Sequence, residues 1–163
     1  MDTNKIFKEY GPYVLILIVV LCIRLYVVCP IRVNGSSMYS TLHDGDIMIL
    51  NIIGYRTQGL KRFDIVVVDD GSEPIVKRVI GLPGEEVSYK NNKLYIDGKL
   101  VKDPYGKKVT DDFTYKVKNG YFVLGDNRTN SKDSRYFGEF SKKQIKGKTN
   151  LILFPFNRFG VKK

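Results

Sequence analysis

The chain has 163 residues, a net charge of +10 and an apolar share of 43%. After one membrane anchor this length leaves room for one soluble domain, and the 11 Tyr and 9 Phe residues can supply its core, which excludes a disordered chain. His43 is the only histidine, which excludes a zinc-type cluster, so we expect no metal and no other cofactor.

The first element is an apolar stretch near the N-terminus. Residues 12–23, PYVLILIVVLCI, carry no charge, and the run continues beyond Arg24 as LYVVCPI. Residues 10–28, with Arg24 reaching toward the interface, have the length of a membrane-spanning helix, about 20 residues. No small-x-small site follows, which favours a retained signal anchor over a cleaved signal peptide. We expect a single-pass protein of the cell membrane with residues 1–9 in the cytoplasm and residues 29–163 on the extracytoplasmic side.

Beyond Arg32 the pattern predicts one short strand after another. Runs rich in Val, Ile, Leu, Tyr and Phe, such as IMILNII, DIVVVDD and YFVLGD, are broken by Gly, Pro, Asn and Asp. Asp97-Gly98 is a two-residue hairpin signal within residues 86–117, which we read as a hairpin-rich subregion. One helical turn fits Ser141–Ile145. We expect a mostly β fold, with an N-terminal transmembrane helix followed by a single compact all-β domain that carries a small hairpin-rich insertion.

A lysine and a serine are candidates for hydrolytic chemistry. On a strand, Lys77 shares its face with the apolar Ile75 and Val79, and burial lowers the pKa of a lysine so that a neutral amine can accept a proton. However, the strand pattern alone fits a lysine whose amine reaches solvent from the edge of a sheet better than it fits a buried base. Ser37 follows Gly35, which permits the close approach that a nucleophile and an oxyanion site need, but Gly-Ser-Ser is also a common loop sequence.

A polar loop, residues 125–138, follows the YFVL strand. Its sequence, GDNRTNSKDSRYFG, concentrates charges and hydroxyl groups. It fits a long connecting turn with an internal Asp–Arg pair, although such a density of polar groups is unusual in a loop that only connects.

Taken together, these segments resemble the bacterial type I signal peptidases, the Ser-Lys enzymes of peptidase family S26, in the compact form of Gram-positive bacteria. The resemblance covers nearly all of the chain. Four boxes in order behind an anchor carry it: Ser37-Met38-Tyr39-Ser40-Thr41-Leu42, Gly45-Asp46-Ile47, Lys77-Arg78-Val79-Ile80-Gly81-Leu82-Pro83-Gly84, and residues 125–138. The tail, Phe154-Pro155-Phe156-Asn157-Arg158-Phe159-Gly160, is similar to the end of this family.

The resemblance implies a role for each matching residue. Ser37 is the nucleophile, Lys77 the general base, and Ser131 the residue that hydrogen-bonds and orients the Lys77 amine. The remaining implied positions structure the polar loop, with an Asp–Arg ion pair and a turn, or line the substrate site, with pockets for small side chains at −3 and −1. The loop-structuring residues are Asp126, Asn127, Asp133 and Arg135, and the substrate-site residues are Val33, Gly35 and Val76.

Two positions depart from the family pattern. Ser40 stands where the family usually has Pro, so the loop loses a fixed φ, and we expect altered efficiency or preference rather than inactivity. Gly35 carries no hydroxyl, whereas some members have a Ser there, so the oxyanion hole would rest on the Ser37 backbone N–H, helped by Ser36.

The implied function is that of signal peptidase I, a membrane-bound serine endopeptidase that removes signal peptides from exported preproteins. The expected partners are these preproteins and membrane lipid, not nucleic acid; oligomeric state is left open. A hydrolase based on His43 is one alternative. Another is a binding protein, either an inactive assembly factor for surface fibres or a polyanion-holding basic surface, since seven Lys or Arg residues and no acid lie beyond Glu139.

Overall fold

The computed structural model describes the backbone of residues 3–26, 28–106 and 109–162, and the side chains of residues 8–21, 29–106 and 109–162. The side chain of Arg24, on which the predicted anchor depends, lies outside the described part. Two sheets and four helices make up the described structure: α1 Thr3–Tyr26, β1 Val28–Arg32, β2 Ile47–Asn51, α2 Ile52–Gln58, β3 Ile65–Asp69, β4 Pro74–Gly81, β5 Glu86–Lys90, β6 Lys93–Ile96, β7 Lys99–Val101, β8 Phe113–Lys116, β9 Phe122–Leu124, α3 Ser134–Phe137, β10 Ile145–Phe154, the 3-10 helix η1 Phe156–Arg158, and β11 Gly160–Val161.

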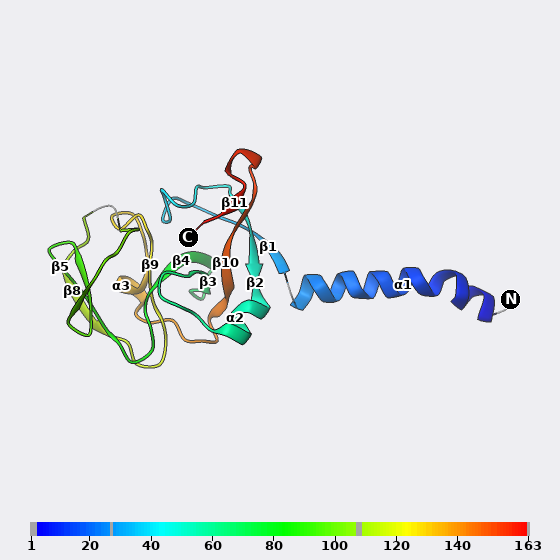
Figure 1. Cartoon of the computed structure of the whole chain (residues 1–163), viewed down its shortest axis with the longest axis horizontal. Helices are drawn as coiled ribbons and strands as arrows, with labels where there is room; N and C mark the ends of the chain where they lie inside the picture. Colours follow the sequence, from blue (N-terminus) through cyan, green and yellow to red (C-terminus); the bar gives the residue numbers. More distant parts are fainter. Residues whose placement is uncertain (1–2, 27, 107–108, 163) are drawn as a thin grey trace.

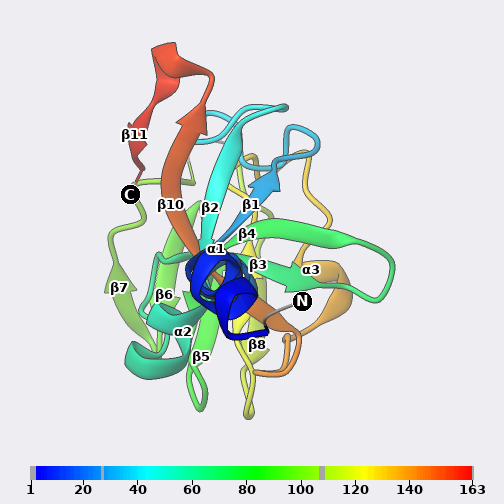
Figure 2. The ribbon, with the colours of Figure 1, turned by 90° about the vertical axis from the view of Figure 1, so that its right-hand side faces the viewer.

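The larger sheet has seven antiparallel strands in the order β1-β2-β10-β3-β4-β9, with β11 paired to β10. Figure 2, which looks along α1, shows β10, β2 and β1 side by side. The order brings strands from both ends of the chain together, because β10 lies between β2 and β3. This sheet therefore places the segment after β1 and the segment after β9 within reach of β4.

The smaller sheet has the order β7-β6-β5-β8, and all four strands fall within residues 86–117. It lies at the end of the domain away from α1 (Figure 1). Its two tight turns have positive φ at both central residues, 49° and 62° at Asn91-Asn92 and 49° and 74° at Asp97-Gly98. These are the torsions of the hairpin turn whose twist matches that of the flanking strands, and Asn, Asp and Gly tolerate them best. The predicted Asp97-Gly98 hairpin is confirmed.

The core consists of three apolar clusters that meet around β4. Val76 packs in the cluster with β2 and β10, Ile80 in the cluster between the two sheets, and Val79 in the cluster on the other side of β3. The strand is consequently buried from Val76 to Gly81, and the two charged residues at its centre are buried with it. This burial sets the chemistry of the site.

The mostly β fold is confirmed, but the description of the domain as all-β is wrong in its details. The apolar run IMILNII ends as a strand at Asn51, where the side-chain oxygen accepts the Gly54 N–H at 2.6 Å and caps α2. A second short helix, α3, lies inside the polar loop. At residues 141–144 the structure has a turn closed by the Gln144 N–H to Ser141 carbonyl bond, and β10 begins at Ile145.

The N-terminal element is a helix that projects away from the β domain (Figure 1). It begins at Thr3, within the expected cytoplasmic segment, and ends at Tyr26, while Val28 already belongs to β1. Its described apolar side chains from Tyr13 to Leu21 are exposed. Within the described residues, no helix is long and apolar enough to cross a membrane.

Candidate active site

Ser37 and Lys77, forty positions apart in the chain, are hydrogen-bonded in the structure. Lys77 Nζ lies 2.6 Å from Ser37 Oγ. Ser37 lies in the serine loop, residues 33–46, between β1 and β2, and Lys77 lies in β4. Gly35, two residues earlier, has φ +82°, a left-handed torsion that glycine adopts without strain, and its N–H donates to Asp44 Oδ1 at 2.8 Å. The loop thus turns sharply just before the serine.

The environment of Lys77 favours the neutral amine. The residue is only 3% exposed, and burial lowers its pKa from 10.5 to about 8, because an ammonium loses its hydration there. Three carboxylates act in the opposite direction and raise the pKa: Asp133, then Asp70 and Asp126. The amine is therefore half deprotonated near pH 8, and only that form can accept the proton of a serine hydroxyl.

The polar loop holds the serine loop through backbone and amide groups. The Asn127 N–H donates to the Ser37 carbonyl at 2.9 Å, and Asn127 Nδ2 donates to the Ser36 carbonyl at 3.1 Å. Asn130 Nδ2 donates to Ser36 Oγ at 3.0 Å. The position of the nucleophilic hydroxyl is thus fixed by a segment about 90 residues away in the sequence.

A buried ion pair connects the same two loops to β4. Arg78 donates to Asp126 from Nε at 2.8 Å and from Nη2 at 2.7 Å, and both side chains are almost fully buried. Thr41 Oγ1 donates to Asp126 Oδ2 at 2.5 Å. Such a bidentate ion pair fixes the relative orientation of the two side chains as well as the distance between them. Because Arg78 is the neighbour of Lys77, this pair also fixes the strand that carries the lysine.

A second ion pair organises the polar loop itself. Arg135 Nε donates to Asp133 Oδ1 and Arg135 Nη2 donates to Asp133 Oδ2, both at 2.9 Å. The buried Asp133 caps α3 by accepting the Arg135 N–H and also accepts the Gly125 N–H at 3.1 Å. Arg135 Nη2 reaches the Arg128 carbonyl at 2.7 Å. The Asp133–Arg135 pair expected from the sequence is present and ties both ends of the loop together.

The C-terminal segment holds the far end of the serine loop. Arg158, in η1, donates to both carboxylate oxygens of Asp46 at 3.0 Å and to the Thr41 carbonyl at 3.2 Å. Its Nη1 lies 3.1 Å from His43 Nε2, and the His43 ring stacks on Tyr39. The described contacts of the His43 ring are therefore with Arg158 and Tyr39, which leaves the His43-based hydrolase without support.

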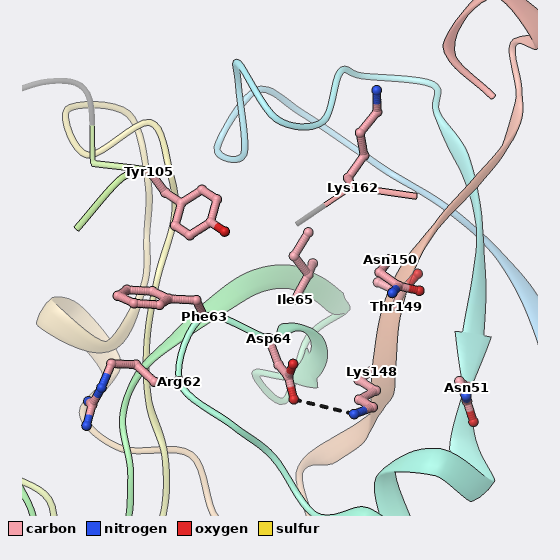
Figure 3. A pocket seen from close by; sticks show the side chains of 10 residues that line it. All are labelled: Asn51, Arg62, Phe63, Asp64, Ile65, Tyr105, Lys148, Thr149, Asn150 and Lys162. Carbon is pink, nitrogen blue, oxygen red and sulfur yellow. Dashed lines mark ion pairs between the residues drawn. The ribbon is translucent and has the colours of Figure 1, made fainter. Parts of the chain in front are cut away.

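A separate pocket of about 370 Å³ lies beside β10 and is lined by polar and charged side chains together with Phe63, Ile65 and Tyr105 (Figure 3). An ion pair of 3.6 Å between Asp64 and Lys148 lies in its wall, and Arg62 is held by Glu85. Neither Ser37 nor Lys77 lines this pocket. Elsewhere in the described part of the chain, no group of three or more His, Cys, Asp or Glu side chains is arranged to hold a metal ion.

The comparisons with known proteins agree on one family. The family model described as "Signal peptidase, peptidase S26" matches residues 7–154, and signal peptidase I S of Bacillus subtilis (strain 168) is 43% identical over 173 residues, 96% of this chain and 94% of that protein. The chain belongs to the peptidase S26 family of signal peptidases. Signal peptidase IB of Staphylococcus aureus is 40% identical and covers 82% of each chain. The crystal structure of a signal peptidase I from Enterococcus faecalis V583 shares 38% identity and a TM-score of 0.51, covering 55% of this chain and 95% of that one.

Membership makes this signal peptidase a serine endopeptidase, and it gives the Ser37–Lys77 contact a context. The geometry brings most of the residues expected from the sequence to one place. Ser37, Lys77, Asp126 and Asn127 are linked directly or through one neighbour. Val33 and Val76 belong to one buried core cluster, on the face of β4 opposite to Lys77.

Ser131 differs from its expected role in this signal peptidase. Its Oγ is buried and has no hydrogen-bond partner among the described residues, so the expected bond to the Lys77 amine is not formed. It lies against Gly125, and a Cβ at Gly125 would contact Ser131 Oγ and would lie 2.5 Å from the Ser37 carbonyl oxygen. Gly125 therefore has to be a glycine for the two loops to approach this closely.

Several residues that hold the site were not identified from the sequence. The sequence assigned no role to Arg78, although a charge in an apolar strand is itself a signal of a buried partner. Thr41, Asn130 and Arg158 act through contacts with residues more than 80 positions away. Local sequence patterns carry no signal for such contacts.

Proposed function

We propose that this chain cleaves N-terminal signal peptides from exported preproteins, with Ser37 as the nucleophile and Lys77 as the general base. The observation that carries the proposal is the 2.6 Å contact between Ser37 Oγ and a Lys77 amine whose pKa is lowered to about 8 by burial. A serine and a lysine in this state are sufficient for acyl transfer without a histidine.

In the proposed mechanism the Lys77 amine takes the Ser37 proton as Oγ attacks the carbonyl carbon of the residue before the cleaved bond. The Ser37 backbone N–H, helped by Ser36, stabilises the oxyanion. Lys77 then gives its proton to the departing amine, and a water activated by the same amine resolves the acyl-enzyme. Val33, Gly35 and Val76 line the site for the small side chains at −3 and −1.

Ser131 is proposed as the residue that orients the Lys77 amine. Its buried Oγ has hydrogen-bonding capacity that no described residue uses, and a hydroxyl buried without a partner costs about 1–3 kcal/mol. A bond between Oγ and the amine would recover part of this cost. Asp126, Asn127, Asp133 and Arg135 are proposed to keep the loop in the shape that makes this contact available.

The helix α1 is proposed to anchor the domain to the cell membrane in a single pass, with the N-terminus in the cytoplasm. Its exposed apolar side chains from Tyr13 to Leu21 support the proposal, because a large exposed apolar surface marks an interaction with a membrane or a partner. The anchor places the site beside substrates that are tethered by their own apolar segments, which raises their effective concentration. Resistance to alkaline extraction of membranes and accessibility of the domain to external protease test this placement.

Two variants test the dyad. Ser37→Ala and Lys77→Ala should each abolish cleavage of a preprotein with small residues at −3 and −1 by the detergent-solubilised protein. Ser141→Ala and Lys99→Ala, at exposed positions away from the site, are the matched controls. Normal cleavage by Lys77→Ala would exclude the dyad, and absence of cleavage by the wild type would exclude the function.

A pH–rate profile tests the state of the amine. The lowered pKa of Lys77 means that the active neutral form increases as pH rises through about 8. The rate of acylation should therefore rise about tenfold per pH unit below that value and level off above it. A flat profile between pH 5 and 9 would contradict the assignment of Lys77 as base.

A further inference from the structure

A cavity of about 600 Å³ opens directly on Lys77. One wall is the end of the β3–β4 hairpin, including Ile75 and the hairpin tip at residues 70–73. The other wall is the polar loop, from which Lys132 and the 76% exposed Tyr136 face the cavity. The cavity thus lies between the strand that carries Lys77, the proposed base, and the polar loop that positions this strand. The proposed mechanism assigns no role to the cavity.

The faces of β4 indicate which part of a substrate this cavity receives. Ile75 and Lys77 line the cavity, whereas Val76 points to the opposite face and packs with Val33 in the core cluster. The proposed pockets for −3 and −1 are on that opposite face. Lys77 must protonate the departing amine, so the chain that follows the cleaved bond leaves on the Lys77 side. The cavity is on the side of the departing chain.

The charges of the cavity are opposite to those of the whole protein. Asp70 and Glu73 lie at the hairpin tip, and neither makes an ion pair with a described residue. Asp70 Oδ1 accepts the Ser72 N–H at 2.9 Å and the Ser72 hydroxyl at 2.7 Å, which keeps its carboxylate ionised and in place. Lys132 supplies one positive charge at the opposite wall. With Lys77 in its neutral, reactive form, the two carboxylates and Lys132 leave the cavity with a net charge of −1, in a chain of net charge +10.

We propose that this cavity binds the first residues of the mature protein after the cleaved bond, and that Asp70 and Glu73 make it prefer basic over acidic side chains there. The proposal rests on the proposed function. Four residues of strand separate Glu73 from Lys77, about 13 Å, so an extended chain reaches the hairpin tip at about its third and fourth residues. The exposed ring of Tyr136 offers an apolar surface for the stems of long basic side chains.

The experiment compares substrates that differ only in charge. One pair carries Lys-Lys or Glu-Glu at positions +3 and +4, and a second pair carries the same residues at +9 and +10. The ratio of kcat/KM for the Lys over the Glu substrate should be about tenfold for the near pair at low ionic strength, and close to one for the distant pair. Each ratio compares two substrates of the same enzyme. A shift in the pKa of Lys77 therefore changes kcat/KM of both substrates by the same factor and does not change the ratio.

Three variants assign the preference to residues. Asp70→Asn combined with Glu73→Gln should bring the near-pair ratio down to about one or two, and Lys132→Gln should raise it. Asp111→Asn combined with Glu86→Gln changes the net charge equally at exposed positions that do not line the cavity, and should leave the ratio unchanged. If the double variant does not fold, the near-pair ratio is measured with Glu73→Gln alone, which changes an exposed residue at the hairpin tip.

The outcomes separate this proposal from the proposed function. Cleavage of both near-pair substrates with equal kcat/KM overturns the cavity proposal and leaves the signal-peptidase activity intact. A preference that survives in the Asp70→Asn, Glu73→Gln variant overturns the role of these two carboxylates. Absence of cleavage of every substrate by the wild type overturns the proposed function and the cavity proposal with it.

Discussion

Replacing the proposed base should make the folded protein more stable while it removes activity. Lys77 is 3% exposed, and its pKa is lowered to about 8 in the folded chain, compared with 10.5 for an unperturbed lysine. The unfolded chain therefore binds more protons than the folded chain between these two values, so the stability of the wild type rises with pH in that window. Below pH 8 the folded state carries the full penalty of a buried ammonium.

The size of this penalty follows from the two pKa values. It amounts to about 3 kcal/mol at pH 7, about 2 kcal/mol at pH 9 and about 1 kcal/mol at pH 10. Lys77→Met keeps an unbranched side chain and removes the penalty, but it loses the bond to Ser37 Oγ, about 1 kcal/mol at every pH. The variant should thus be about 2 kcal/mol more stable than the wild type at pH 7 and about equally stable at pH 10.

Denaturant unfolding of the full-length wild type and variant in the same detergent, at pH 7, 9 and 10, measures the difference. Other titrating groups are common to both proteins and cancel to first order. The decisive result is the pH dependence, because a simple packing effect of Met is the same at every pH. A variant that is less stable than the wild type at pH 7, or a difference that does not change between pH 7 and 10, would refute the reasoning.

Three further substitutions test how the site is held. Gly125→Ala places a Cβ 2.5 Å from the Ser37 carbonyl oxygen, so it should destabilise the fold by about 1–3 kcal/mol and reduce kcat, and wild-type kinetics would contradict the close approach. Asp126→Asn leaves Arg78 buried without its anion and should cost about 3–5 kcal/mol in denaturant unfolding at pH 7; a loss below 1 kcal/mol would contradict burial of the pair. Arg158→Gln leaves the buried Asp46 carboxylate without its cation and breaks the link to the Thr41 carbonyl, so the thermal midpoint should fall by a few degrees and kcat by about tenfold or more. A lowered midpoint with wild-type kcat, measured where the variant is folded, would assign Arg158 a purely structural role.

The strands could be predicted because their information is local. Short runs of Val, Ile, Leu, Tyr and Phe, broken by Gly, Pro, Asn and Asp, identify β3, β4 and β5 within a few residues, and Asp97-Gly98 fixes a hairpin by its torsions alone. The secondary-structure prediction was wrong where one local pattern was compatible with both a strand and a helix. Ile52 and Ile53 continue the apolar run of β2, yet the side chain of Asn51 caps a helix that starts with them. Apolar composition alone does not distinguish the last residues of a strand from the first turn of a helix.

The site was predictable only in part, and for a different reason. The reactive residues lie in recognisable boxes, so Ser37 and Lys77 could be paired through the family resemblance. The contacts that hold them, such as Arg158 with Asp46, join positions 112 apart in the sequence, and nothing near either residue indicates the other. Ser131 shows the opposite case: the resemblance implies a contact with Lys77, whereas in the structure its Oγ has no partner.

The ion pairs of Asp133 and Asp126 help to explain how Lys77 can have acids around it and still be a base. Asp133 and Asp126 both raise the Lys77 pKa, and two unpaired carboxylates in this low-dielectric core would hold the amine in its protonated, unreactive form. Each is paired with an arginine of its own, Arg135 and Arg78, whose positive charge opposes that of the carboxylate at the amine. Desolvation then outweighs the residual attraction and brings the pKa to about 8. Removing either arginine should therefore raise the pKa of Lys77 and shift the pH–rate profile upward, and a loop that served only to shape the backbone would leave that profile where it is.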